Sequence, residues 1–159
     1  MHSRIFQVSE NPVPVDERIS EDRYYDGFVG SHADYVVTVE YQSDDYRDDL
    51  RWIREANNGI KVDIPNGTIT VTSKKEYFDK KHDTFKELAS ELADITLEDF
   101  TSGRQRFKMH DLTSAYDNKY GFYIDDYDEY AGLTTLDDWV RSVEENKVYY
   151  VGSIFDYHF

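Results

Sequence analysis

The sequence predicts an α+β fold in a single domain over residues 1–159, with three to four helices packed on a largely antiparallel sheet. Three observations lead to this prediction. The length of 159 residues suits one domain with a sizeable core. An alternating apolar pattern flanks an Asn-Gly turn, which is typical of an antiparallel hairpin. Strand-like and helix-like segments follow one another without the strict alternation of a parallel βαβ fold.

The first third of the chain contains two predicted strands and a short turn. Residues 4–8 form an apolar strand segment, and the two prolines within residues 11–14 end it because they lack backbone donors. Ser20 can cap a short turn or helix that Gly30 stops. Residues 35–41 are rich in valine and tyrosine, so they predict a second strand.

A helix is predicted to follow Ser43. This serine is a favourable N-cap residue, and Tyr46, Leu50 and Ile53 have helical spacing. The Asn-Asn-Gly sequence at 57–59 supplies a C-terminal stop.

The strongest local signal is a β-hairpin. Apolar and polar residues alternate in 60–64 and again in 68–72, and Asn66-Gly67 lies between the two segments. Asn-Gly favours the tight turn of a hairpin, so residues 60–72 are predicted to form two antiparallel strands.

A long helix is predicted from Ser73 to about Ile95. Ser73 and Glu76 have the spacing of a capping box, and an apolar stripe follows at Phe78, Phe85, Leu88, Leu92 and Ile95. Residues 96–103 predict a further short helix that ends at glycine. The basic strip that follows is interpreted as a solvated face and contains Arg104, Arg106 and Lys108.

The C-terminal third contains two predicted strands and one helix. Residues 120–124 predict a strand, and the mixed acids and tyrosines at 125–130 predict a loop or strand end. Thr135 is the predicted cap of a helix that continues through Trp139, and residues 147–154 predict the last strand.

Composition excludes several classes of function. The chain has no cysteine, so disulfides, thiolate catalysis and cysteine-ligated metals are excluded. No stretch approaches the roughly 20 apolar residues of a membrane span, and the first residues lack the apolar run of a signal peptide, so we expect a cytoplasmic protein. A net charge of −15 opposes direct binding to nucleic acid or to anionic membranes.

Catalytic and cofactor motifs are absent from the sequence. The cluster Asp125, Asp126, Asp128 and Glu129 could hold a hard cation, but it lacks the glycine and the spacing of an EF-hand. A His110-Asp111 pair beside hydroxyls is compatible with a catalytic dyad or with a surface histidine. No glycine-rich phosphate loop is present. We therefore expect no enzyme activity, cofactor or metal.

Negative charge and tyrosine are concentrated in the same two segments. Residues 10–49 have a net charge of −9 and residues 111–159 a net charge of −8, whereas residues 50–110 have a net charge of +1. Thirteen of the fourteen tyrosines lie in the two acidic segments. Interleaved carboxylates and phenols imitate the charge of a nucleic acid, although tyrosines in strands are also simply half-buried residues with a polar tip.

In size, acidity, lack of cysteine and aromatic content, the chain resembles the small anti-restriction and anti-CRISPR inhibitors carried by phages and conjugative elements, several of which imitate DNA. Residues 123–130 and 136–139 are similar to acidic segments of DNA-mimic anti-restriction proteins. The resemblance implies a non-catalytic inhibitor. Its partner would be a basic nucleic-acid-binding protein, either a CRISPR effector nuclease or a restriction–modification enzyme, whose DNA channel it blocks.

The DNA-mimic hypothesis predicts one contiguous partner-binding face of acids and tyrosines. Its members are Asp44, Asp45, Tyr46, Asp48, Asp49, Tyr123, Asp125, Asp126, Tyr127, Asp128, Glu129, Tyr130, Asp137 and Asp138. Two alternatives remain open: an acidic accessory protein whose charge serves solubility, and an unrecognised metal-dependent enzyme.

Overall fold

The computed structural model describes residues 1–126 and 132–159, and it confirms the predicted α+β class. Within these residues, one mixed, mostly antiparallel sheet contains seven strands. The strands are β1 (His2–Ser9), β2 (Tyr35–Val39), β3 (Ile60–Asp63), β4 (Thr68–Val71), β5 (Tyr123–Asp126), β6 (Gly132–Thr135) and β7 (Val148–His158). The helices are α1 (Asp44–Ala56), α2 (Lys74–Ala93), α3 (Leu97–Ser102), α4 (Arg106–Tyr116) and α5 (Leu136–Ser142), with short 3₁₀ helices η1 (Val15–Glu17) and η2 (Glu21–Tyr24).

The long strand β7 organises the sheet. The strand order is β3-β4-β7-β1-β5-β6, and β2 also pairs with β7. Residues 148–150 of β7 pair with β4, whereas residues 154–158 pair with β2. Only the β1–β5 pair is parallel among the strands that the structure describes. The central strands β1 and β7 are buried over most of their length because both have neighbours on either side.

Apolar side chains cover both faces of the sheet. On one face, Leu50 of α1 and Trp139 of α5 belong to the same buried cluster as Phe6 of β1. On the other face, Tyr24 of η2 packs in a smaller cluster with Phe155 of β7. Helices α1 and α5 therefore cover one face, and the segment around η2 covers part of the other.

The predicted N-caps Ser43, Ser73 and Thr135 are confirmed, and Thr96 caps a fourth helix. The side chains of Ser43, Ser73, Thr96 and Thr135 each accept a hydrogen bond from the backbone N–H three residues later. Each of these bonds satisfies a donor that has no partner inside the helix, and such a cap is worth about 1 kcal/mol. The sequence therefore fixes the starts of these helices locally.

The predicted hairpin is also confirmed. Ile60 pairs with Val71 and Asp63 with Thr68, and Gly67 in the turn has a positive φ of 60°. Gly59 precedes the hairpin with a φ of +70°, and a Cβ at this position would lie 2.2 Å from the backbone oxygen of Ser73. Only glycine fits there, so Gly59 allows the hairpin and the start of α2 to approach closely.

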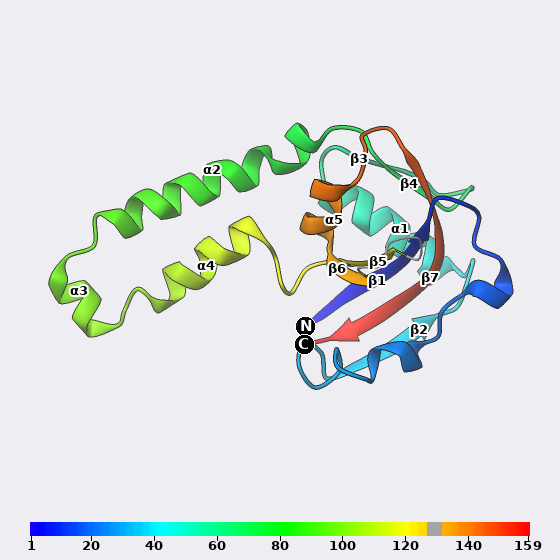
Figure 1. Cartoon of the computed structure of the whole chain (residues 1–159), viewed down its shortest axis with the longest axis horizontal. Coiled ribbons are helices and arrows are strands. Elements are labelled where there is room, and N and C mark those ends of the chain that lie inside the picture. Colours follow the sequence, from blue (N-terminus) through cyan, green and yellow to red (C-terminus); the bar gives the residue numbers. More distant parts are fainter. Residues whose placement is uncertain (127–131) are drawn as a thin grey trace.

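Helices α2, α3 and α4 form a projecting structure, which we call the arm (residues 74–116). Figure 1 shows the arm extending away from the sheet, with α2 and α4 side by side and α3 at the far end. The rest of the chain is called the body. Helix α2 was predicted, but its apolar stripe is only half-buried, and Tyr77 is the buried residue of this helix. Helix α4 begins within the basic strip and was not predicted.

The structure also differs from the sequence prediction at the acidic segment near the C-terminus. Asp125 and Asp126 form the end of strand β5, one of the two predicted alternatives, but both are buried instead of lying on an acidic surface. Strand β6 follows and was not predicted, whereas residues 127–131 lie outside the described residues. No helix in the described part of the chain has the length and apolar character needed to cross a bilayer.

Candidate functional site

The structure separates the fourteen predicted partner-binding residues into three groups. Six are buried, four are exposed, and four lie outside the described residues. The buried residues are Tyr46, Asp49, Tyr123, Asp125, Asp126 and Asp137. The exposed residues are Asp44, Asp45, Asp48 and Asp138, and those outside the described residues are Tyr127, Asp128, Glu129 and Tyr130. The six buried side chains do not form an exposed face: the fold uses five of them internally, and Asp49 lines the groove described below.

Asp125 links the segment around η2 to the sheet. Its carboxylate accepts hydrogen bonds from Arg23 Nε at 2.8 Å and Nη2 at 3.1 Å, and from the Tyr24 hydroxyl at 3.1 Å. Burial, together with the neighbouring Asp125 charge, raises the pKa of Tyr24 above its ordinary value. The carboxylate is 1% exposed and fully engaged, so it is a structural group.

Asp126 and Asp137 link α5 to its surroundings. The indole Nε1 of Trp139 donates to Asp126 Oδ2 at 3.1 Å, which joins α5 to β5. Asp137 accepts from the Tyr77 hydroxyl at 2.7 Å, from Lys81 Nζ at 2.6 Å and from the backbone N–H of Asn118 at 2.8 Å. Because Tyr77 and Lys81 begin the arm and Asn118 follows its end, this one carboxylate anchors both ends of the arm to the body.

A cavity of about 330 Å³ lies at this anchor. Trp52, Tyr120 and Phe122 contribute aromatic walls, and Lys81 and Asp137 also line it. Both oxygens of Asp137 already accept hydrogen bonds within the fold, two at Oδ1 and one at Oδ2.

Two of the predicted interface tyrosines serve the fold. The Tyr46 hydroxyl donates to the backbone oxygens of Val151 at 3.1 Å and Gly152 at 3.2 Å. The Tyr123 hydroxyl donates to the backbone oxygen of Lys119 at 2.7 Å, and burial raises the pKa of Tyr123 to about 12. The alternative interpretation of tyrosine, an apolar body with a polar tip, applies at both positions.

The four exposed acids of the predicted site lie on helices α1 and α5. Asp44 and Asp48 of α1 form ion pairs with Arg47 and Arg51, each three residues later. Asp138 forms the corresponding pair with Arg141 in α5 at 2.7 Å. Such surface pairs are weak, typically about 0.3–0.5 kcal/mol, so a competing partner can displace them easily.

Four carboxylates of the described residues line a hollow between α1, β2 and β7, which we call the acidic groove. Its volume is about 410 Å³. It is lined by Arg4, Tyr35, Val37, Thr38, Val39, Asp45, Asp48, Asp49 and Asp156. The three α1 acids lie on one side of the helix because positions three and four residues apart are neighbours on a helix surface. Tyr35 and Val37 of the edge strand β2 are 38% and 49% exposed, so the opposite wall is accessible.

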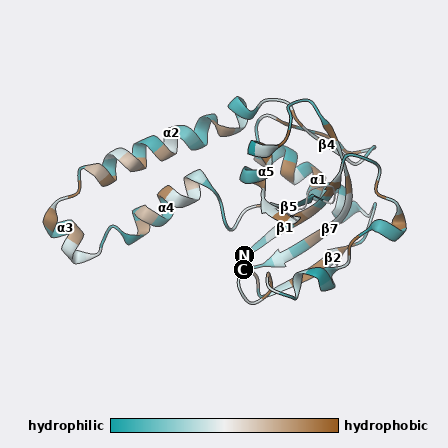
Figure 2. Ribbon diagram, in the orientation of Figure 1, coloured by the Kyte–Doolittle hydropathy of each residue, from teal (hydrophilic) through white to brown (hydrophobic). Residues whose placement is uncertain are grey.

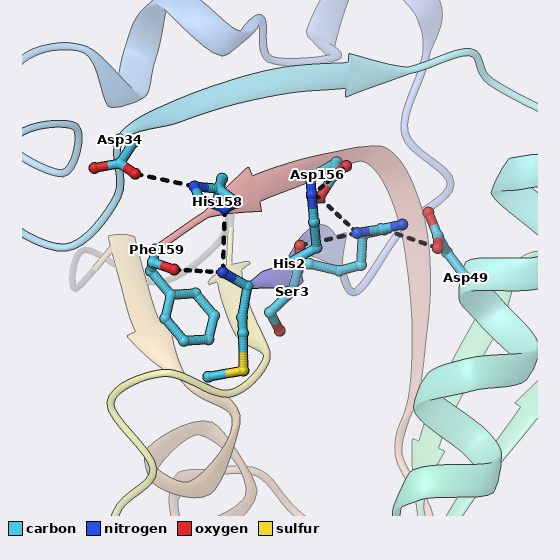
Figure 3. Close-up of polar contacts among 9 residues, drawn as sticks. His2, Ser3, Asp34, Asp49, Asp156, His158 and Phe159 are labelled. Atoms are coloured by element: carbon cyan, nitrogen blue, oxygen red, sulfur yellow. Dashed lines mark hydrogen bonds and ion pairs between the residues drawn. The ribbon is translucent and has the colours of Figure 1, made fainter.

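Arg4 connects the two sides of the acidic groove. Its Nη1 donates to Asp156 Oδ1 at 2.6 Å, and its Nε forms an ion pair with Asp49 Oδ1 at 2.8 Å. Figure 3 shows Asp156 on β7 and Asp49 on α1 at the two ends of this connection, with His2 also beside Asp156. Arg4 therefore pairs with two of the four carboxylates that line the groove, Asp49 and Asp156, whereas Asp48 pairs with Arg51.

Asp49 retains unused hydrogen-bonding capacity. Its side chain is 7% exposed, and its Oδ2 atom is buried with no hydrogen-bond partner. Burial raises the pKa of Asp49, as do the nearby charges of Asp156 and Asp45, while Arg4 opposes the shift. A cationic donor that entered the groove would satisfy this oxygen and reduce the repulsion among the acids.

The sequence predicted three of the five charged residues that line the acidic groove. Asp45, Asp48 and Asp49 were predicted site residues, whereas Arg4 and Asp156 were not. The available signal was weak, because Arg4 is one charged residue in an apolar strand and its partner is 152 residues away. Only the pairing of β1 with β7 brings Arg4 and Asp156 together.

No metal centre and no known relative was found. Within residues 1–126 and 132–159, no group of three or more His, Asp or Glu side chains is placed to hold a metal ion. Comparison with protein-family models, curated proteins and solved structures gives no match. The geometry and charge of the chain are therefore the basis for a functional proposal.

Proposed function

We propose that this chain is a non-catalytic inhibitor that occupies the basic nucleic-acid-binding surface of another protein. The proposed partner is a CRISPR effector nuclease or a restriction–modification enzyme, the class implied by the compositional resemblance. The body supports the proposal because its sequence has a net charge of −14, compared with −1 for the arm. A phosphate-binding surface attracts such a body over a long range and orients it before contact.

The observation that carries the proposal is the unsatisfied oxygen of Asp49 in the acidic groove. Its Oδ2 is buried without a hydrogen-bond partner in a hollow that three further carboxylates line. A guanidinium or ammonium group has the charge opposite to these carboxylates, and it has several N–H donors for their oxygens. Such groups are the ones that a protein presents to nucleic-acid phosphates.

The proposal differs from the DNA-mimic hypothesis in the location of the site. The proposed contact surface no longer includes Asp125, Asp126 and Asp137, because each is buried and hydrogen-bonded inside the fold. Asp45 and Asp48 remain, together with Asp49 and the newly found Asp156. The interface therefore centres on α1, β2 and β7.

A capture experiment with matched variants tests the proposal. The bait is the full chain, compared with an Asp45→Asn/Asp48→Asn groove variant and an Asp83→Asn/Glu87→Gln control that removes the same charge from the arm. We expect a bacterial lysate to yield a nucleic-acid-binding protein that duplex DNA or about 0.5 M salt releases. The groove variant should bind that protein at least about tenfold more weakly, and the control should bind it unchanged.

A cleavage assay completes the test. The purified partner should lose DNA binding or cleavage when the full chain is added, and the groove variant should restore it. Binding that competing duplex DNA leaves intact would contradict the proposal. If the groove variant and the arm control lost partner binding and inhibition equally, the acids would act only through the total charge of the chain. The acidic groove would then not be the binding site.

A further inference from the structure

The far end of the arm exposes a set of large apolar side chains, which we call the tip. Leu97 and Phe100 of α3 are 79% and 71% exposed, and Phe107 and Met109 of α4 are 79% and 61% exposed. Figure 2 shows apolar residues on α3 and on the facing part of α4. Two phenylalanines, a leucine and a methionine at these exposures exceed the scattered apolar residues of an ordinary surface.

The arm has no enclosed core. In the continuous described range 78–122, every residue is either half-buried or exposed. Helices α2 and α4 contact each other along their length, but a pair of helices leaves part of each apolar stripe in water. Helices of this length gain most of their stability from packing, so a further surface against the arm would stabilise it.

We propose that the tip docks against the tip of a second copy of this chain, which gives a two-fold symmetric dimer joined by the arms. In such an interface, the same patch of each copy meets its counterpart, so the patch must be complementary to itself. The next two properties of the arm favour this occupant.

The first property is the distribution of net charge between arm and body. The bodies, at −14 each, repel one another, whereas an arm has a net charge of only −1. Helix α2 has 20 residues and is about 30 Å long, several times the Debye length of about 8 Å at physiological salt. Two copies that meet at their tips therefore keep their acidic bodies beyond the range of strong repulsion.

The second property is the presence of both acidic and basic side chains at the tip. Glu98 lies on α3, Arg106 is the first residue of α4, and Arg104 lies in the turn just before it. These three side chains form no ion pair with any residue that the structure describes. Across a two-fold axis, the acid of one copy can face the bases of the other, and the reciprocal contact forms at the same time.

The available area fits a weak, reversible dimer. At the exposures above, Leu97, Phe100 and Phe107 offer about 500 Å² per copy, or about 1,000 Å² for a pair. Met109 lies two positions after Phe107 on α4 and therefore on another side of that helix, so it is not counted. This area lies near the lower limit of a specific interface. We therefore expect a dissociation constant between about 1 μM and 1 mM.

Sedimentation of the full chain over a concentration series tests the dimer. The expected result is a monomer at low concentration and a dimer at about 1 mM. A Phe100→Asp/Phe107→Asp variant should remain monomeric, whereas Val15→Asp, at a 75% exposed apolar position of the body, should dimerise like the unmodified chain. Circular dichroism of each variant establishes that the arm is still helical.

A charge exchange tests the two-fold geometry independently of folding. Glu98→Arg alone and Arg106→Glu alone should each weaken the dimer at least about threefold, and the double exchange should restore it. Restoration shows that the two positions meet across the interface. A double variant no better than the single variants would overturn the symmetric docking.

A cross-link locates the contact in the chain, which contains no cysteine. Thr101→Cys at the exposed end of α3 should form an intermolecular disulfide much faster than Val15→Cys does. Equal rates, or a chain that stays monomeric at about 1 mM, would overturn the proposal. Binding of a monomeric chain to anionic vesicles through Phe100 and Phe107 would also overturn it, because it would assign the tip to a lipid surface.

Discussion

The body and the arm bury apolar side chains to very different degrees, although both contain amphipathic helices. Helix α1 places Leu50 and Ile53 fully inside the body, at 0% exposure. Helix α2 is longer, yet Tyr77, at its base, is its buried residue. An apolar stripe therefore specifies a helix and a contact face, whereas burial depends on what the rest of the chain places against that face.

The same two regions differ in how they use charge. In the body, Asp125, Asp126 and Asp137 are inside the fold and hydrogen-bonded. In the arm, oppositely charged residues are interleaved on an exposed surface, and Lys108 pairs with Glu91 between α4 and α2 at 2.6 Å. The negative charge of the body is therefore partly structural, whereas the acids of the arm are nearly balanced by bases.

The anchor between body and arm should produce the largest effect on stability. Asp137→Ala removes the acceptor for Tyr77, Lys81 and the Asn118 backbone, so it should lower the free energy of unfolding by about 3–5 kcal/mol. Denaturant unfolding measures this loss. Hydrogen exchange should show that the arm amides lose protection first, since both ends of the arm are released.

The neighbouring acid provides the control for the anchor. Asp138 is 58% exposed and pairs only with Arg141 on its own helix. Asp138→Ala should cost less than about 1 kcal/mol, the size of a surface pair plus a helix-start charge. Equal losses at positions 137 and 138 would show that the buried contacts of Asp137 do not hold the arm.

A matched pair of leucine truncations sharpens the contrast in burial. Leu50→Ala creates a cavity in the body and should cost about 2–5 kcal/mol. Leu88→Ala in the half-buried stripe of α2 should cost about 1 kcal/mol, because less apolar area is lost and the site is open to relaxation. Urea unfolding at low protein concentration measures both values. A cost at Leu88 as large as that at Leu50 would mean that the arm has a packed core.

The sequence predicts local structure well where a few adjacent residues determine it. The caps at Ser43, Ser73 and Thr135 and the turn at Gly67 depend on hydrogen bonds and backbone angles within about four residues. The α+β class follows from these elements and their order.

The buried acids could not be predicted because their partners are distant. Asp125 is held by Arg23 and Tyr24, about a hundred positions earlier in the chain. A run of acids ordinarily indicates a solvated surface, since a buried carboxylate requires paired donors. The projection of the arm could not be predicted either, because the apolar stripe of α2 has the same pattern whether the helix packs on a sheet or on one other helix.

The smallest predicted effect concerns the pH dependence of the acidic groove. The pKa of Asp49 is raised above its ordinary value of about 3.9 by burial and by its neighbouring acids. The native state therefore binds this proton more tightly than the unfolded state does. Protonated Asp49 favours folding, so its contribution to stability falls as pH rises from about 3.9 through the raised pKa.

An Asp49→Asn variant isolates this contribution. Urea unfolding from about pH 3.5 to 6.5 should show stability falling with pH more steeply in the unmodified chain than in the variant. Above this window, Asp49→Asn should lose less stability than an ordinary broken buried pair, because Arg4 keeps Asp156 as a partner. A variant whose pH dependence matches that of the unmodified chain would show that Asp49 titrates normally. The body would then have no strained carboxylate for a basic partner to relieve.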